Sequence, residues 1–172
     1  MIVSILNGEM KMSKNSIIPI FYSSDGNYLP YLSVSLTSLK ENADKTRNYC
    51  IYVLYSGTLG KDKKAVEKLK EDWFDIRFVN VGKRFDEMKQ FLTNRDYYTN
   101  AIYYRLFIAE MFPEYDRGIY LDCDIAVTGD ISLLYRTRLG NDLLGAAPDD
   151  ALPALELPLG KDSRREVSVT YP

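Results

Sequence analysis

Two aspartates separated by one residue, Asp122-Cys123-Asp124, have the type and spacing that could do chemistry in this chain. They lie between two apolar runs, residues 118–121 and 125–127, which have the character of β-strand sequence. An acidic pair at such a strand end is costly to bury unless a cation meets it. Carboxylate oxygens suit Mg²⁺ or Mn²⁺, which take one or two carboxylates together with substrate phosphates. The simpler interpretation is a strand that ends in two solvated aspartates, one of which caps the next turn.

A second polar cluster, Asp25-Gly26-Asn27-Tyr28, follows a strand that we predict over residues 17–23. Ligands of open α/β sheets bind beyond the carboxyl ends of the strands, so this cluster is a candidate for the same site as the acidic pair. Asp25 and Asn27 can hydrogen-bond a base or a ribose, and Tyr28 can stack on a planar ring. Gly26 allows a close backbone approach. The alternative is an ordinary turn with a helix cap, because Asp, Gly and Asn all favour turns.

Arg105 is a candidate cation for this site, because it lies on a predicted helix just before the strand that carries the acidic pair. Its guanidinium could offset the carboxylates or hold a phosphate. The alternative is a surface salt bridge, which contributes little to stability.

Length and composition limit the classes of function. The 172 residues suit one domain with a hydrophobic core, and the formal net charge of −2 argues against nucleic acid as a partner. The chain has no histidine, which excludes a Ser-His-Asp triad, a Cys-His pair and a histidine metal ligand within it. The 14 tyrosines fit strands and core, and they would also suit polar, ring-shaped ligands.

The two cysteines, Cys50 and Cys123, both lie in predicted strands and lack metal-site spacing. We therefore expect two buried, reduced thiols and a cytoplasmic protein. Residues 1–16 do not have the pattern of a signal peptide, and we find no run that is long and apolar enough to cross a membrane.

Strand-like and helix-like segments alternate, which predicts an α/β fold with a mostly parallel sheet flanked by helices. The predicted strands are residues 17–23, 50–55, 76–81, 118–122 and 143–147. The first predicted helix places Leu29, Leu32, Leu36 and Leu39 on one face.

Further helices are predicted over residues 62–70, with Ala65, Val66 and Leu69 inward, and over residues 99–111, with Tyr103, Leu106, Phe107 and Glu110 at helical spacing. Pro113 should end the second of these. We also expect a short helix and loop over residues 85–94, and one helical turn over residues 131–135 capped by Asp130.

Five segments, taken together and in order, resemble glycosyltransferase family 8, the retaining sugar-nucleotide transferases that include lipopolysaccharide galactosyl- and glucosyltransferases and glycogenin. The segments are residues 20–28, 31–39, 103–106, 120–125 and 144–147, and their order and spacing match from about Ile17 to Asp149. The resemblance implies a Rossmann-like nucleotide-diphospho-sugar transferase fold of the GT-A type.

The resemblance also implies a nucleotide site. Asp25, Asn27 and Tyr28 look like the positions that hold the uracil and ribose of a UDP-sugar. The backbone of Cys123 would lie near the ribose.

A metal and a donor sugar are implied in the same way. Asp122 and Asp124 look like ligands of Mn²⁺, the usual metal of the family, or of Mg²⁺. Arg105 and Asp149 resemble positions that contact the donor sugar. A metal there would neutralise the departing diphosphate while the anomeric carbon gains positive character.

The family pattern continues beyond Asp149 with an Asn-x-Gly segment, a Gln-Asp-Gln-Asp-like segment and a metal-binding histidine, none of which this sequence has. We therefore expect a chain truncated at its C-terminus, without the third metal ligand, the acceptor half of the cleft or a group beneath the anomeric carbon. The expected organisation is a disordered extension over residues 1–14, a nucleotide-sugar-binding domain over residues 15–149, and an irregular tail over residues 150–172.

The function implied is metal-dependent transfer of a hexose from a UDP-sugar to a saccharide or lipid-linked glycan acceptor, with retention and with peripheral membrane contact in a full-length protein. One alternative is a non-catalytic nucleotide-sugar-binding module. Another is a nucleotidyltransferase, although residues 23–26 lack the Gly-rich, basic phosphate loop expected of that class.

Overall fold

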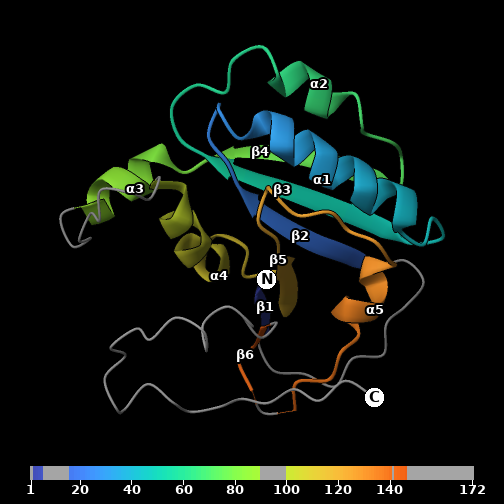
Figure 1. Ribbon diagram of the computed structural model, residues 1–172. Coiled ribbons are helices and arrows are strands. Elements are labelled where there is room, and N and C mark those ends of the chain that lie inside the picture. The colour runs from blue at the N-terminus through green and yellow to red at the C-terminus, as the bar shows by residue number, and fades with distance from the viewer. Residues whose placement is uncertain (1, 6–15, 90–99, 141, 147–172) are drawn as a thin grey trace, which may run out of the picture.

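The computed structural model of the protein describes residues 2–5, 16–89, 100–140 and 142–146, and Figure 1 shows their arrangement. The described strands form one sheet in the order β4-β3-β2-β5-β1-β6. Their bounds are β1 Ile2–Ile5, β2 Ile17–Ser23, β3 Asn48–Tyr55, β4 Phe74–Asn80, β5 Arg117–Tyr120 and β6 Leu144–Ala146. The four strands β4, β3, β2 and β5 are parallel, and β1 pairs antiparallel with both β5 and β6. This confirms the predicted α/β fold with a mostly parallel sheet.

Helices cover both faces of the sheet (Figure 1). Their bounds are α1 Leu29–Asn42, α2 Lys63–Glu67, α3 Gly82–Met88, a 3₁₀ helix η2 Asn100–Phe107, α4 Ile108–Met111 and α5 Ile131–Tyr135. One core lies between the sheet and α1, α2 and α5, and the other lies between the sheet and α3, η2 and α4. Because both faces are buried, β2 and β3 are apolar along nearly their whole length.

The first helix confirms the predicted apolar face, since Leu29, Leu32, Leu36 and Leu39 are all fully buried. The turn α5 is also confirmed, with the Asp130 side chain accepting a hydrogen bond from the Ser132 backbone N–H at 2.9 Å.

The segment predicted as a single helix over residues 99–111 is instead η2 followed by α4, and it ends before Pro113. A 3₁₀ helix has three residues per turn, so its buried positions recur every three residues. The buried residues are Ala101, Tyr104 and Phe107, whereas Leu106 is 60% exposed. The residues at α-helical spacing in this segment therefore do not form one buried face, since Leu106 and Glu110 are both exposed.

Two other expectations differ from the structure. Ala65 is exposed, because α2 is short and buries Val66 alone among its own residues. Residues 2–5, expected in a disordered extension, form β1, whose pairing with both β5 and β6 satisfies its backbone hydrogen bonds. The expected tail over residues 150–172 lies outside the described residues. In the part of the chain that the structure describes, no helix combines the length and apolarity needed to cross a membrane.

Candidate functional site

A pocket of about 330 Å³ opens at the carboxyl ends of the neighbouring strands β2 and β5. Three segments line it: the turn after β2, the helix η2 and the loop after β5. In Figure 1 the two strands lie side by side in the middle of the sheet. The pocket thus lies between the ends of two adjacent parallel strands and the helix η2, which covers one face of the sheet.

Most residues singled out from the sequence meet in this pocket. Those that line it are Asp25, Tyr28, Arg105, Asp122, Cys123 and Asp124. Asn27 is exposed on the same turn and is not part of the lining. Asp149 lies outside the described residues.

The turn after β2 is organised by Asp25. Its Oδ1 atom accepts hydrogen bonds from the backbone N–H groups of Asn27 at 2.9 Å and Tyr28 at 3.1 Å. One oxygen of this carboxylate therefore stabilises the turn that leads into α1, in agreement with the alternative interpretation of residues 25–28 as a turn. The same turn sets the Tyr28 ring at the pocket, with its centroid 5.5 Å from that of Tyr31.

Gly26 allows a close approach within the protein itself. A Cβ atom at this position would lie 3.2 Å from the carbonyl oxygen of Thr58. The loop after β3 therefore packs directly on the turn that carries Asp25, and a larger residue would push the two apart.

The loop of the acidic pair is anchored to β2. The Leu121 N–H donates to the Phe21 carbonyl oxygen at 2.9 Å, and the Cys123 thiol donates to the Ser23 carbonyl oxygen at 3.1 Å. Cys123 is 5% exposed, whereas the side chain of Asp122 is 45% exposed and Asp124 is exposed. Burying the middle residue leaves the carboxylates on either side facing outward.

Burial raises the pKa of the Cys123 thiol to about 12, and the carboxylates of Asp122 and Asp124 also raise it. The thiol is therefore neutral at physiological pH and acts as a hydrogen-bond donor.

Arg105 extends from η2 toward Asp122, the first aspartate of the acidic pair. Its Nε donates to the Ile102 carbonyl oxygen at 3.0 Å, and one of its terminal nitrogens lies 3.4 Å from Oδ1 of Asp122. Its guanidinium carbon is 4.4 Å from the centroid of the Tyr120 ring, in a cation–π contact. Arg105 thus makes the salt bridge that was its alternative role, but it does so inside the pocket.

Two outward-facing carboxylates on one short loop fit a hard divalent cation. Mg²⁺ and related ions are often held by one or two carboxylates, with phosphate oxygens and water completing the coordination. Among the described residues, no group of three or more His, Cys, Asp or Glu side chains could hold a metal. An ion held by Asp122 and Asp124 would need oxygens of a phosphorylated ligand or of water to complete its coordination.

Sequence reasoning missed several residues of the pocket. Ser24 is 1% exposed, donates from its backbone N–H to Leu54 and from its hydroxyl to the Asp25 carbonyl oxygen, and so fixes the start of the turn. Tyr120 provides the ring beneath Arg105, and burial raises the pKa of its phenol. Tyr120 could have been predicted from its place at the end of an apolar run. Ile102 could not, because its place in the pocket lining depends on the 3₁₀ geometry of η2.

Comparison with known proteins points to one family. The family model for glycosyl transferase family 8 matches residues 19–167. General stress protein A of Bacillus subtilis (strain 168) is 30% identical over 141 residues, which cover 80% of this chain and 48% of that protein. Lipopolysaccharide 1,2-glucosyltransferase of Escherichia coli (strain K12) is 27% identical over 161 residues, which cover 93% of this chain and 46% of that protein. The chain thus spans less than half the length of these relatives.

Solved structures share the fold. The galactosyltransferase LgtC, in complex with donor and acceptor sugar analogs, aligns with a TM-score of 0.60 and 28% identity over 72% of this chain and 44% of that chain. The apo structure of the bifunctional glycosyltransferase WbbM aligns with a TM-score of 0.59 and 27% identity, covering 80% of this chain and 23% of that chain. The parallel four-stranded sheet flanked by helices matches that of GT-A family 8 transferases, over part of their length.

Proposed function

Since this chain belongs to glycosyl transferase family 8, we propose that its pocket binds a UDP-hexose together with Mn²⁺ or Mg²⁺ and that the protein transfers the hexose, with retention, to a saccharide acceptor. The observation that carries this proposal is the convergence of the Asp25 turn, Arg105 and the acidic pair on one pocket of about 330 Å³. Residues about 80 to 100 positions apart in the sequence meet there, at the sheet edge where α/β proteins bind ligands.

The turn after β2 is the proposed site of the nucleoside. The exposed face of Tyr28 offers a surface on which uracil can stack. The second carboxylate oxygen of Asp25 would accept a hydrogen bond from the base or the ribose. Asn27 would contact the ribose from its exposed position on the same turn, and the backbone of Cys123 would lie near it.

The acidic pair is the proposed metal site. Asp122 and Asp124 would hold the ion against the diphosphate, and the ion would supply positive charge that stabilises the diphosphate as it departs. Arg105 would contact the donor sugar, because its guanidinium is held over Tyr120 at the same wall of the pocket. Asp149, which lies outside the described residues, is proposed as a second donor-sugar contact.

The acceptor is proposed as a saccharide or a lipid-linked glycan. This follows the printed names of two similar proteins, a lipopolysaccharide glucosyltransferase and a galactosyltransferase complex with an acceptor sugar analog. Peripheral contact with a membrane would accompany a lipid-linked acceptor. Both cysteines are buried free thiols, which fits transfer in the reducing cytoplasm.

Isothermal titration calorimetry with UDP, in the presence of Mn²⁺ and then of a chelator, tests the proposal. UDP should bind more tightly with Mn²⁺, and Asp122→Ala with Asp124→Ala should abolish the difference. The matched control is Asp72→Ala with Asp86→Ala, which also removes two exposed carboxylates but away from this pocket. Binding of UDP that is indifferent to Mn²⁺ in the unmodified protein would contradict the proposed function.

A nucleotide-sugar-binding module without transfer activity is the second candidate. It is favoured by the small number of protein ligands: the described part of the chain brings two carboxylates to the metal site and no cluster of three candidate ligands. Hydrolysis of a UDP-hexose separates the two candidates. Release of UDP that disappears in Asp124→Asn would support the transferase, and Mn²⁺-dependent binding without any release would support the module.

A further inference from the structure

The metal-site loop runs for ten residues without regular structure. The chain from Leu121 to Asp130 contains no strand or helix, because β5 ends at Tyr120 and α5 begins at Ile131. The start of this loop is tied to β2 by Leu121 and Cys123, as described above. Its second half, beyond Asp124, is held by a different element.

That element is the C-terminal half of α1. The Val127 N–H donates to Oγ of Ser38 at 2.9 Å, and the Val127 carbonyl oxygen accepts a hydrogen bond from Nδ2 of Asn42 at 3.0 Å. Both backbone groups of one loop residue are therefore bonded to side chains of one helix. Val127 itself is only 9% exposed and packs in the core beneath α1.

Each of these two side chains of α1 also makes a hydrogen bond within the helix. The Ser38 hydroxyl donates its proton to the Ser35 carbonyl oxygen at 2.8 Å, so it can serve Val127 only as an acceptor. The Asn42 amide also donates to the Ser38 carbonyl oxygen at 2.9 Å, which orients its other N–H toward Val127. Each of these donors therefore has its own acceptor, and both backbone groups of Val127 are held by α1.

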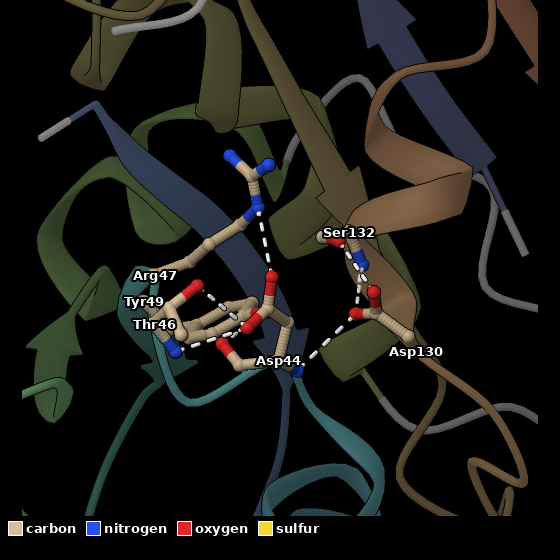
Figure 2. A network of polar contacts seen from close by, with 6 residues as sticks. All are labelled: Asp44, Thr46, Arg47, Tyr49, Asp130 and Ser132. Carbon is tan, nitrogen blue, oxygen red and sulfur yellow. Dashed lines mark hydrogen bonds and ion pairs between the residues drawn. The ribbon is translucent and has the colours of Figure 1, made fainter. Parts of the chain in front are cut away.

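A second anchor lies three residues further on (Figure 2). Oδ1 of Asp130 accepts hydrogen bonds from the backbone N–H groups of Ser132 at 2.9 Å and Asp44 at 3.3 Å, while the Ser132 hydroxyl donates to Oδ2 at 2.7 Å. Asp44 lies just past α1, where its own carboxylate accepts from the backbone and hydroxyl of Thr46. The loop is thus joined to α1 and to the segment that follows it.

We propose that Ser38 and Asn42 are positioning residues for the Asp124 carboxylate, acting through the main chain of Val127. The inference rests on the proposed function, in which Asp124 is a metal ligand. Asp124 lies three positions before Val127, and three residues span at most about 10 Å, so a fixed Val127 restricts where Asp124 can go. A metal ligand held in advance loses less conformational freedom when the ion binds.

The test compares UDP affinity with Mn²⁺ and with a chelator, because only the Mn²⁺-dependent part reports on Asp124. Ser38→Ala removes the acceptor for Val127, and Asn42→Asp keeps the shape of the side chain but removes its two donors. Each should weaken UDP binding with Mn²⁺ by about tenfold, the lower end of the range for groups that orient metal ligands. Affinity with the chelator should stay unchanged.

Two further variants make the test specific. Ser38→Thr retains the hydroxyl and should restore the Mn²⁺-dependent affinity. Thr37→Ala removes a comparable hydrogen bond of the same helix, from the Thr37 hydroxyl to the Ser33 carbonyl oxygen at 2.7 Å, and should leave the affinity unchanged. Asn42 is exposed on the last turn of α1, so Asn42→Asp keeps the test usable if Ser38→Ala fails to fold.

The inference is overturned if Ser38→Ala and Asn42→Asp bind UDP as the unmodified protein does, or if both lose the same factor with and without Mn²⁺, which would show a purely structural role. This result differs from failure of the proposed function. In that case the unmodified protein itself would show no Mn²⁺-dependent binding, and the positioning role would fall with it.

Discussion

The guanidinium of Arg105 lies 3.4 Å from the carboxylate of Asp122, at the place where a divalent cation is proposed to bind. The two side chains are 29% and 45% exposed, so their ion pair is of the solvent-screened kind that contributes up to about 1 kcal/mol. Arg105 is held in place separately by its contact with Tyr120 and by its bond to the Ile102 carbonyl oxygen. Without a metal, Arg105 therefore neutralises part of the charge that the metal would meet.

Arg105→Ala should consequently tighten the binding of Mn²⁺ to the protein in the absence of nucleotide. The expected change is about two- to fivefold, as fits the removal of a partly exposed competitor. Titration of Mn²⁺, followed by the electron paramagnetic resonance signal of the free ion, measures it directly. Arg105→Lys keeps the positive charge and should bind Mn²⁺ like the unmodified protein. Weaker Mn²⁺ binding by the alanine variant would mean that Arg105 organises the acidic pair and does not compete for it.

Gly118 lies on β5, the strand that leads into the loop of the acidic pair, and packs against Phe21 of β2. A Cβ atom there would lie 2.5 Å from Cε2 of Phe21. The Phe21 ring cannot easily move, because it stacks on Tyr52 at 5.2 Å and meets Phe112 at 4.9 Å between centroids. Gly118→Ala should lower the free energy of unfolding by about 1–3 kcal/mol, measured by urea denaturation.

Gly129→Ala is the matched control for this change, since no atom of the described residues, apart from those of its chain neighbours, lies within 4 Å of the Cβ position that it would introduce. It should leave the free energy of unfolding nearly unchanged. If Gly118→Ala were as stable as Gly129→Ala, β5 and β2 would have to be less tightly packed than the structure indicates.

The sequence predicted well those elements whose apolar residues follow a simple local pattern. The face of α1 could be predicted because Leu29, Leu32, Leu36 and Leu39 recur at helical spacing, and β2 could be predicted because residues 17–22 are apolar. The buried face of the segment around Arg105 could not be predicted in this way. Buried positions recur every three residues in the 3₁₀ helix η2, so α-helical spacing does not identify them and includes the exposed Leu106.

The residues that line the candidate site could be predicted from the sequence, whereas the residues that hold its loop in place could not. Asp25, Tyr28 and the acidic pair could be singled out because polar residues at strand ends are conspicuous in sequence. Ser38 and Asn42 could not, since serine and asparagine in a helix have many ordinary roles and their partner, Val127, is 89 and 85 residues away. Long-range contacts of this kind require the fold.

The buried tyrosines make the protein sensitive to high pH. Burial raises the pKa of Tyr49 from 10.0 to about 12, and the carboxylates of Asp130 and Asp44 add to the effect. Above pH 10.0 the unfolded chain loses this proton while the folded protein retains it, so stability falls as the pH rises toward 12. The fall should be visible in the melting temperature between neutral pH and about pH 11.

Tyr49→Phe should make this fall shallower, because it removes one of the groups that titrate. It should also lower stability slightly at neutral pH, where the Tyr49 hydroxyl donates to the Asp44 carbonyl oxygen at 3.3 Å. Tyr31→Phe, at a side chain that is 58% exposed, serves as the control and should leave the pH profile as it is. Identical profiles for all three proteins would exclude Tyr49 as a source of the alkaline loss.

Asp130 caps α5 and also anchors the end of the metal-site loop to Asp44. Replacement by asparagine and by alanine should separate these two effects. Asp130→Asn keeps an oxygen that can accept from the backbone of Ser132 and Asp44, and should cost little stability. Asp130→Ala removes the helix cap and the link to Asp44, and should cost about 0.5–2 kcal/mol in urea denaturation.

If the second anchor also restrains Asp124, Asp130→Ala should weaken UDP binding with Mn²⁺ but not with a chelator, and Asp130→Asn should bind normally. An alanine variant that is less stable but keeps its full Mn²⁺-dependent affinity would assign the positioning of Asp124 to the Val127 clamp alone.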